Sequence, residues 1–207
     1  MVGYSAIESE TVSGIVSTWA PKICTVIIAI AISLTTNIIP HVTTSYIKKD
    51  YNEVNRRFNQ AISTMLIITI PMALLLLLLS NESYYIFYGS SKYGSLALKA
   101  SAISHIFFGV WTVINTCLQS MRKFKIVYIN SVAGLLSNAL LDIPLILLFN
   151  IIGLPEYIAT IVSTCIGYSI SIVIALIYLR KEMHFSYRKT IELIKKLIIP
   201  SITIIVM

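Results

Sequence analysis

Charged side chains are scarce in this sequence of 207 residues, because Asp, Glu, Lys and Arg together make up only 12% of it. Soluble domains carry about 25% charged and about 45–50% apolar residues. Here the apolar share is 57% and the mean hydropathy is +0.83. This composition excludes an ordinary soluble domain and predicts a protein that crosses a membrane several times.

Cysteine and the motifs of soluble enzymes are also scarce. The three cysteines, Cys24, Cys117 and Cys165, all lie in apolar runs, and their odd number favours small buried residues over a disulfide framework. The sequence has no phosphate-binding glycine loop, no paired-histidine metal motif, no G-x-S-x-G and no close pair of carboxylates. We therefore expect no enzyme, no metal site and no cofactor, and a role in translocation or in structure.

Five long apolar runs predict transmembrane helices, at about residues 19–39, 61–79, 96–118, 131–148 and 158–179. A sixth run at 197–207 would reach only about 16 Å at 1.5 Å per residue, against a hydrocarbon core of about 30 Å. We expect an all-α polytopic bundle over residues 19–207, with five full spans and a truncated sixth, preceded by an extracytoplasmic segment at 1–18.

Residues 46–62 have a different pattern, in which apolar side chains recur at helical spacing and basic ones fill the rest of the wheel. This pattern predicts a short amphipathic helix that lies on the membrane surface.

Basic side chains gather in alternate connections. The connections after the first, third and fifth spans hold four, three and six Lys or Arg residues, and those after the second and fourth hold one and none. Cytoplasmic loops of membrane proteins carry this excess of positive charge. The connections at 41–60, 119–128 and 180–196 are therefore predicted to be cytoplasmic, with the N-terminus outside. The net charge of +7 belongs to these loops, so we expect no nucleic-acid partner.

The fourth span is organised around a polar stripe. At 100° per residue, Ser131, Gly134, Asn138 and Asp142 fall within roughly 80° of one another. A carboxylate near the centre of a bilayer costs about 2.5–3.5 kcal/mol even on a lenient insertion scale. The stripe is therefore interpreted as lining a polar pathway. A packing role, or a place for Asp142 near the membrane edge, stays open as the alternative.

A second polar face runs along the third span. His105 on this face is either a proton-linked switch or a hydrogen-bonded packing residue. The residues predicted to line a cavity or substrate pathway are Asn37, Ser101, His105, Asn115, Gln119, Asn138 and Asp142. Three prolines are predicted to kink or end helices, namely Pro40, Pro71 and Pro144.

Five segments, taken in order, resemble a known family. They are STWAPKICTVIIAIAISLTTNIIPHVTTSYIKKDYNEVNRRFNQAISTMLIITIPM at 17–72, IFYGSSKYG at 86–94, CLQS at 117–120, SNALLDIPLILL at 137–148 and GLPEYIATIVSTCIGY at 153–168. The set is similar to the second lobe of lipid II and oligosaccharide-lipid flippases, in the multidrug/oligosaccharidyl-lipid/polysaccharide (MOP) flippase superfamily. The resemblance implies a transporter of the bacterial cytoplasmic membrane, whose two lobes open alternately around a central cavity.

The implied substrate is an undecaprenyl-linked cell-wall or polysaccharide precursor of the lipid II type, moved in contact with membrane lipids. The whole first lobe of such flippases has no counterpart here, so we expect a fragment or one half of a split transporter. Such a chain would pair with a separate N-terminal half or with itself. Two alternatives stay open: half of a cation-coupled multidrug exporter that uses Asp142 as its proton or Na⁺ site, and a non-transporting remnant or assembly subunit.

Overall fold

A computed structural model describes residues 5–183, and every regular element in this range is a helix. In chain order these are α1 (Ala6–Gly14), the π-helical turn η1 (Ile15–Trp19), α2 (Ala20–Thr36), α3 (Ile39–Ile47), α4 (Tyr51–Leu78), α5 (Ser80–Tyr88), α6 (Gly94–Ser120), α7 (Phe124–Ile152) and α8 (Glu156–Met183). Five stretches are long and apolar enough to cross a membrane: Ala6–Ile47, Tyr51–Leu78, Gly94–Ser120, Phe124–Ile152 and Glu156–Met183. The predicted all-α bundle with five spans is confirmed, and the predicted sixth run lies outside the described residues.

The first span is longer than the hydropathy pattern predicts. Ser5 caps α1 in a reciprocal capping box with Glu8, and the helical run continues through the π turn. This turn lies next to Pro21, which has no N–H to donate to a regular α-helical ladder. Pro40 does not end the run but lies in the first turn of α3, where proline is tolerated. Residues 6–18 are thus continuous with the first span, and their position relative to the membrane stays a prediction.

The separate surface helix predicted at 46–62 is wrong. The Asp50 carboxylate accepts a hydrogen bond from the Glu53 amide at 3.0 Å and so caps α4, which then continues without a break to Leu78. The apolar stripe of this segment, which includes Val54 and Phe58, is buried against neighbouring helices and not against lipid. The same pattern of apolar and basic residues therefore forms the basic end of a helix that is long and apolar enough to cross a membrane.

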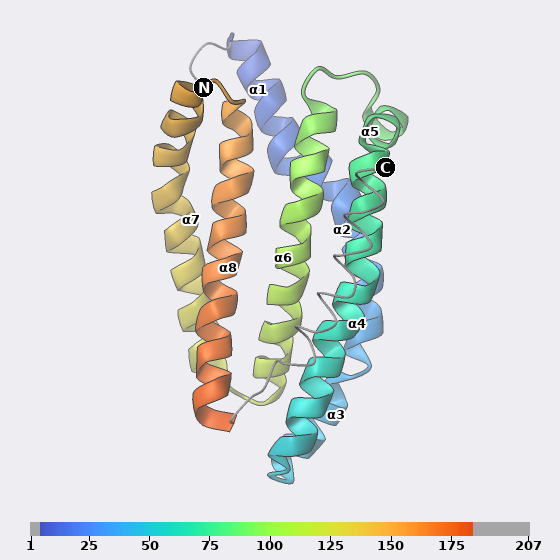
Figure 1. The fold of residues 1–207 in the computed structure, drawn as a ribbon, viewed down its shortest axis with the longest axis vertical. Helices are drawn as coiled ribbons and strands as arrows, with labels where there is room; N and C mark the ends of the chain where they lie inside the picture. The colour runs from blue at the N-terminus through green and yellow to red at the C-terminus, as the bar shows by residue number, and fades with distance from the viewer. Residues whose placement is uncertain (1–4, 184–207) are drawn as a thin grey trace.

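The helices run up and down the bundle side by side (Figure 1). The helices α2 and α4 lie at one edge, α6 lies in the middle, and α7 lies at the other edge against α8. The turn from α7 to α8 is short because Gly153 adopts a left-handed conformation with φ of 78° and ends α7. This tight turn fixes α7 and α8 as an antiparallel hairpin.

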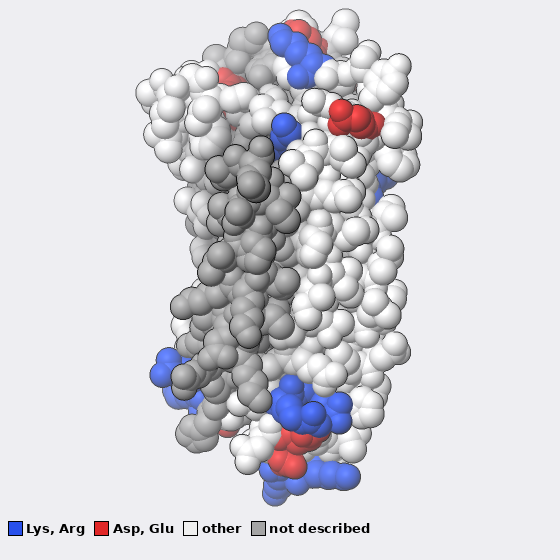
Figure 2. All heavy atoms as spheres, turned by 45° about the vertical axis from the view of Figure 1, so that its right-hand side comes forward, with Lys and Arg blue, Asp and Glu red and all other residues white. Residues whose placement is uncertain are grey.

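Basic residues gather at one end of the bundle, where the turns after α3 and α6 and the end of α8 meet. Figure 2 shows them at the lower end of the visible face, and among the described residues a broad white band without charged side chains separates them from the charges of the other end. Lys123 links two elements there, because its amine lies 5.6 Å from the centre of the Tyr46 ring and 5.9 Å from that of Tyr178. Its hydrogen bond to Tyr46 raises the pKa of Lys123 above the ordinary value for lysine. That this end is cytoplasmic stays a prediction.

Two apolar clusters hold the bundle together. One is centred on Phe58, Met65 and Leu118, and the other, nearer the opposite end, includes Val12 and Leu98. The helix α7 contributes little to either: Ile126 belongs to the first, and no buried α7 residue belongs to the second. The position of α7 is therefore set by contacts of another kind.

Candidate functional site

The contacts that hold α7 lie along one stripe, at every fourth residue. The buried residues of α7 are Ile126, Asn130 and Gly134, and the half-buried Asn138 and Asp142 continue the same spacing. Residues four apart lie above one another on one face of a helix. This stripe contains three of the four residues that define the polar pathway in the sequence, and it faces α8.

Two glycines bring the backbones of α7 and α8 into direct contact. A Cβ atom built on Gly134 would lie 2.7 Å from the carbonyl oxygen of Gly167, and one on Gly167 would lie 2.7 Å from that of Gly134. Only glycine fits at such a distance. The Ser171 hydroxyl donates to the carbonyl oxygen of Asn130 at 2.8 Å beside this crossing. In a membrane, close backbone packing and interhelical hydrogen bonds of this kind drive helix association.

Asn138 and Asp142 meet one residue of α8. The Ser163 hydroxyl lies 2.7 Å from Asn138 Oδ1, 2.9 Å from Asp142 Oδ1 and 2.9 Å from the carbonyl oxygen of Thr160. A hydroxyl has one proton to donate, so this group of oxygens offers more acceptors than Ser163 alone can satisfy. These oxygens can accept a hydrogen bond from a substrate hydroxyl, or they can bind a proton or a cation.

A second polar contact joins α6 to α7. The Asn130 amide donates to Asn115 Oδ1 at 3.0 Å, and both side chains are buried. The Nδ2 atom of Asn115 and the indole nitrogen of Trp111, one turn earlier, are buried without a hydrogen-bond partner among the described residues. The third and fourth spans thus meet through amides.

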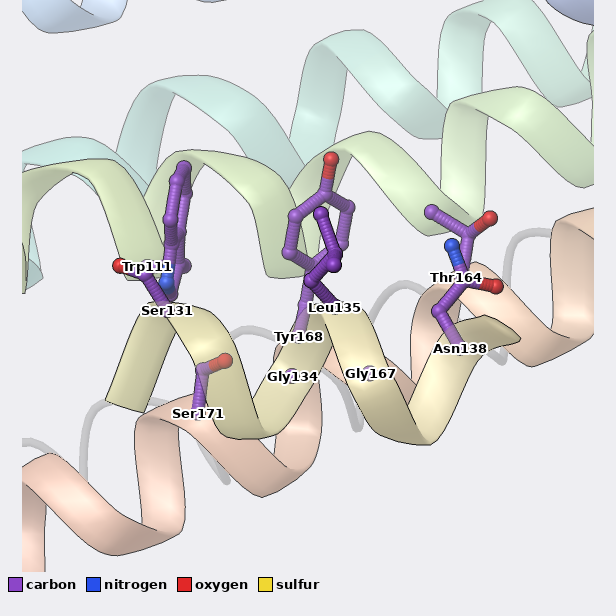
Figure 3. A pocket seen from close by; sticks show the side chains of 9 residues that line it. All are labelled: Trp111, Ser131, Gly134, Leu135, Asn138, Thr164, Gly167, Tyr168 and Ser171. Atoms are coloured by element: carbon purple, nitrogen blue, oxygen red, sulfur yellow. The ribbon is translucent and has the colours of Figure 1, made fainter. Parts of the chain in front are cut away.

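Beyond this pair, α6 and α7 diverge and leave a cleft of about 280 Å³ that α8 closes on one side. Figure 3 shows the rings of Trp111 and Tyr168 standing between α6 and α7, with Asn138 and Thr164 farther along. The centres of the two rings are 5.5 Å apart. The lining consists of Trp111, Ser131, Gly134, Leu135, Asn138, Thr164, Gly167, Tyr168 and Ser171. The cleft therefore offers aromatic faces, hydroxyls and an amide, and no basic side chain.

The other residues predicted to line the pathway lie apart from this cleft. Ser101 is buried on α6, and His105 makes a 2.8 Å hydrogen bond to the carbonyl oxygen of Ser101. Asn37 and Gln119 are exposed, Asn37 at the break between α2 and α3 and Gln119 near the end of α6. Asn115, Asn138 and Asp142 are thus the predicted residues that the structure brings to the contacts around α7.

The three predicted proline positions also differ from one another. Pro71 and Pro144 lie inside continuous helices, α4 and α7. Pro40 lies after a two-residue interruption of the helical run at 37–38. Many hydroxyls of the first and third spans bond their own helix, as Thr25 does to the Pro21 carbonyl and Thr112 to that of Phe108. Those hydroxyls need no polar cavity.

Sequence reasoning missed two participants. Ser163 is not among the residues predicted to line the pathway, and the predicted polar stripe begins at Ser131, one residue after Asn130. The signal for both was a matching four-residue spacing on two helices. Small or polar residues recur every four positions on α8, at Ser163, Gly167 and Ser171, and on α7, at Asn130, Gly134 and Asn138. In residues 5–183, no group of three or more His, Cys, Asp or Glu side chains is placed to hold a metal ion.

Comparison with known proteins gives the following similarities. The family model described as lipid II flippase MurJ matches residues 10–207. The lipid II flippase MurJ of Bacillus subtilis (strain 168) is 27% identical over 191 residues, which cover 90% of this chain and 34% of that relative. The chain thus spans about a third of the length of this curated relative. No solved structure matches it.

Proposed function

This chain belongs to the lipid II flippase MurJ family, and we propose from that premise that it forms one lobe of a flippase in the cytoplasmic membrane. The proposed activity is movement of an undecaprenyl-linked cell-wall precursor of the lipid II type to the outer face by alternating access. The chain provides one wall of the substrate pathway, and a second bundle provides the other.

The observation that carries this proposal is the incomplete burial of α7. Only 6% of its most apolar window is buried inside the bundle. Yet α7 carries Asn138 and Asp142 at half-buried positions beside a cleft with polar groups in its lining. Polar groups left against acyl chains cost up to several kcal/mol each. A facing bundle and the water between the two lobes would remove that cost.

The second bundle is a separate N-terminal half or another copy of this chain. The B. subtilis relative has about two thirds of its length outside the matched region, which is ample for such a bundle. The cleft itself has no Lys or Arg, so it cannot neutralise a pyrophosphate. The facing bundle would therefore bind the charged part of the substrate, and the α6–α7–α8 cleft would contact uncharged hydroxyl or amide groups.

The packing suggests how this lobe would move. The glycine crossing and the tight turn at Gly153 make α7 and α8 one rigid hairpin. The contact between α6 and α7 is much smaller than that between α7 and α8, and it includes the Asn115–Asn130 hydrogen bond. Transporters of this general kind rock rigid bundles about a site near the middle of the membrane. Widening of the cleft between α6 and α7 is the local change that this arrangement permits most easily.

The test is flipping of a fluorescent lipid-linked sugar precursor in proteoliposomes. We expect no activity from the monodisperse chain alone and activity when a facing half is co-reconstituted. In the active assembly, Asn138→Leu should lower the rate about tenfold, the effect of losing about 1.4 kcal/mol at the barrier. Leu140→Ala, on the exposed side of α7, is the matched control and should leave the rate unchanged. Transport by the isolated monomer would contradict the proposal.

A second candidate function is half of a cation-coupled exporter. The observation in its favour is the group of oxygens around Asp142, because carboxylate, amide and hydroxyl oxygens suit a proton or Na⁺. In the same proteoliposomes, a cation gradient should then drive a cationic dye, and Asp142→Asn should abolish that transport. Movement of the sugar precursor without movement of the dye would favour the flippase.

A further inference from the structure

Lys22 is an unusual basic residue in this molecule. It lies in the first turn of α2, one turn after Trp19, inside the first candidate span. A lysine within a span either pairs with another group or extends its amine to the headgroup level. Lys22 is exposed, and no carboxylate of residues 5–183 lies within 4.0 Å of its amine. Its partner is therefore to be sought outside these residues.

The depth of Lys22 in the membrane follows from its neighbours. It lines a groove together with Leu76 of α4. On the same helix, Arg56 marks the basic end, and Leu76 comes twenty residues later. Twenty residues of helix span about 30 Å, which equals the thickness of the hydrocarbon core. The stacked rings of Trp19 and Tyr88, 5.4 Å apart, lie beside the groove, as expected for an interfacial aromatic belt. Lys22 thus lies at the headgroup level opposite the basic end.

The groove at this level is almost entirely apolar. It has a volume of about 370 Å³ between α2, α4 and α5. Its walls include Val26, Ile27, Leu76 and Phe87, and Val26 and Phe87 are each 66% exposed. The polar groups among the side chains that line it are the Lys22 amine and the hydroxyls of Ser83 and Tyr88. An ammonium group and a hydroxyl above an apolar trough match a lipid that has a phosphate above an acyl chain.

We propose that this groove is a binding site for an anionic phospholipid of the outer leaflet, with its phosphate on Lys22 and Ser83 and one acyl chain along Val26 and Phe87. The charge favours this occupant, because one ammonium group balances the single negative charge of a phosphodiester. A polyprenyl pyrophosphate carries more negative charge than one lysine can balance. The site is independent of the proposed transport activity, since it lies on α2, α4 and α5, whereas the cleft lies on α6, α7 and α8.

The first test measures binding of phosphatidylglycerol to the purified full chain by native mass spectrometry in detergent. A lysine near a membrane surface contributes about 1 kcal/mol toward an anionic lipid, so Lys22→Ala should weaken binding about fivefold. Lys22→Arg should retain it. Lys92→Ala is the matched control, because Lys92 is also predicted to lie outside, but its amine sits over the Tyr93 ring and does not line the groove. It should leave the affinity unchanged.

The second test keeps the positive charge and fills the groove. Val26→Trp places a bulky ring where the acyl chain would lie, and it should prevent crosslinking of a phosphatidylglycerol that carries a photoreactive group in its chain. Circular dichroism and a monodisperse elution profile check that each variant is folded. Equal affinity of Lys22→Ala and the parent chain would overturn the proposal. So would displacement of phosphatidylglycerol by equimolar undecaprenyl pyrophosphate, because the site would then belong to the polyprenyl carrier.

Discussion

The helices α4 and α7 are nearly equal in length and are both strongly apolar, yet they differ in what surrounds them. The most apolar windows of α4 and α7 have mean hydropathies of 2.5 and 2.0. The bundle buries 44% of that window in α4 and 6% in α7. Hydropathy therefore indicates whether a helix can enter the membrane, and the buried share indicates how far other helices of the protein surround it. By this measure α4 is surrounded and α7 is not.

The two helices are also held by different forces. Side-chain packing surrounds α4, in a cluster that includes the fully buried Phe58 and Met65. The helix α7 is held by a backbone crossing at Gly134 and by hydrogen bonds from Ser163 and Ser171. Because lipid tails are as apolar as the side chains, such packing and polar contacts decide association in a membrane. Substitutions at the contacts of α7 therefore test whether backbone packing and hydrogen bonds hold this helix.

The largest effect is expected at the glycine crossing. Gly167→Val would drive a side chain into the backbone of α7, and we expect a loss of about 3 kcal/mol in the free energy of unfolding, the upper end for overpacked sites. Thermal unfolding in micelles, followed by tryptophan fluorescence, measures it. Gly14→Ala is the control, because nothing lies within 4 Å of the added methyl group, and it should be neutral or stabilising. Equal, small effects of the two substitutions would contradict the close contact.

A smaller effect is expected at the amide pair between α6 and α7. Asn130→Leu removes the donor to Asn115 Oδ1. The buried Asn115 side chain then has two atoms without a hydrogen-bond partner among the described residues, because its Nδ2 already lacks one. We expect a loss of about 1.5 kcal/mol, and partial recovery in Asn115→Leu/Asn130→Leu, because both polar groups are then gone. A double-mutant cycle gives the coupling energy. Additive losses would show that the two amides do not interact.

The smallest effect on stability is expected at Ser163. Ser163→Ala removes the hydroxyl shared by Asn138 and Asp142, and interhelical hydrogen bonds of this kind are worth about 0.6 kcal/mol on average. Ser169→Ala is the matched control on the same helix, since within residues 5–183 the Ser169 hydroxyl donates to the Cys165 carbonyl of its own helix. In the active assembly, Ser163→Ala should reduce flipping more than Ser169→Ala does. The same transport rate in both variants would assign Ser163 a packing role only.

The sequence predicts the spans well and their partners poorly. Apolar runs locate the second to fifth spans because insertion into lipid depends on each helix alone. The identity of the residue opposite Asn138 depends on how two helices cross, which is set by Gly134 and Gly167 together. The spacing of Ser163, Gly167 and Ser171 indicates which residue lies opposite Asn138, but only when it is compared with the matching spacing on α7. The surface helix predicted at 46–62 failed for a related reason, since an amphipathic pattern does not tell lipid from protein as the apolar neighbour.

The most direct test of the central claim is the accessibility of the two sides of α7 in the assembled protein. Asn138→Cys and Leu140→Cys are made separately after the three native cysteines are replaced, and each is treated with a water-soluble thiol reagent in membranes. The account predicts that Asn138→Cys faces an aqueous pathway, so that the reagent labels it and the lipid-linked precursor protects it. Leu140 is 73% exposed on the opposite side of α7, which the account assigns to lipid, so Leu140→Cys should react only with a membrane-permeant reagent. Labelling of Leu140→Cys by the water-soluble reagent, with Asn138→Cys unreactive, would contradict it.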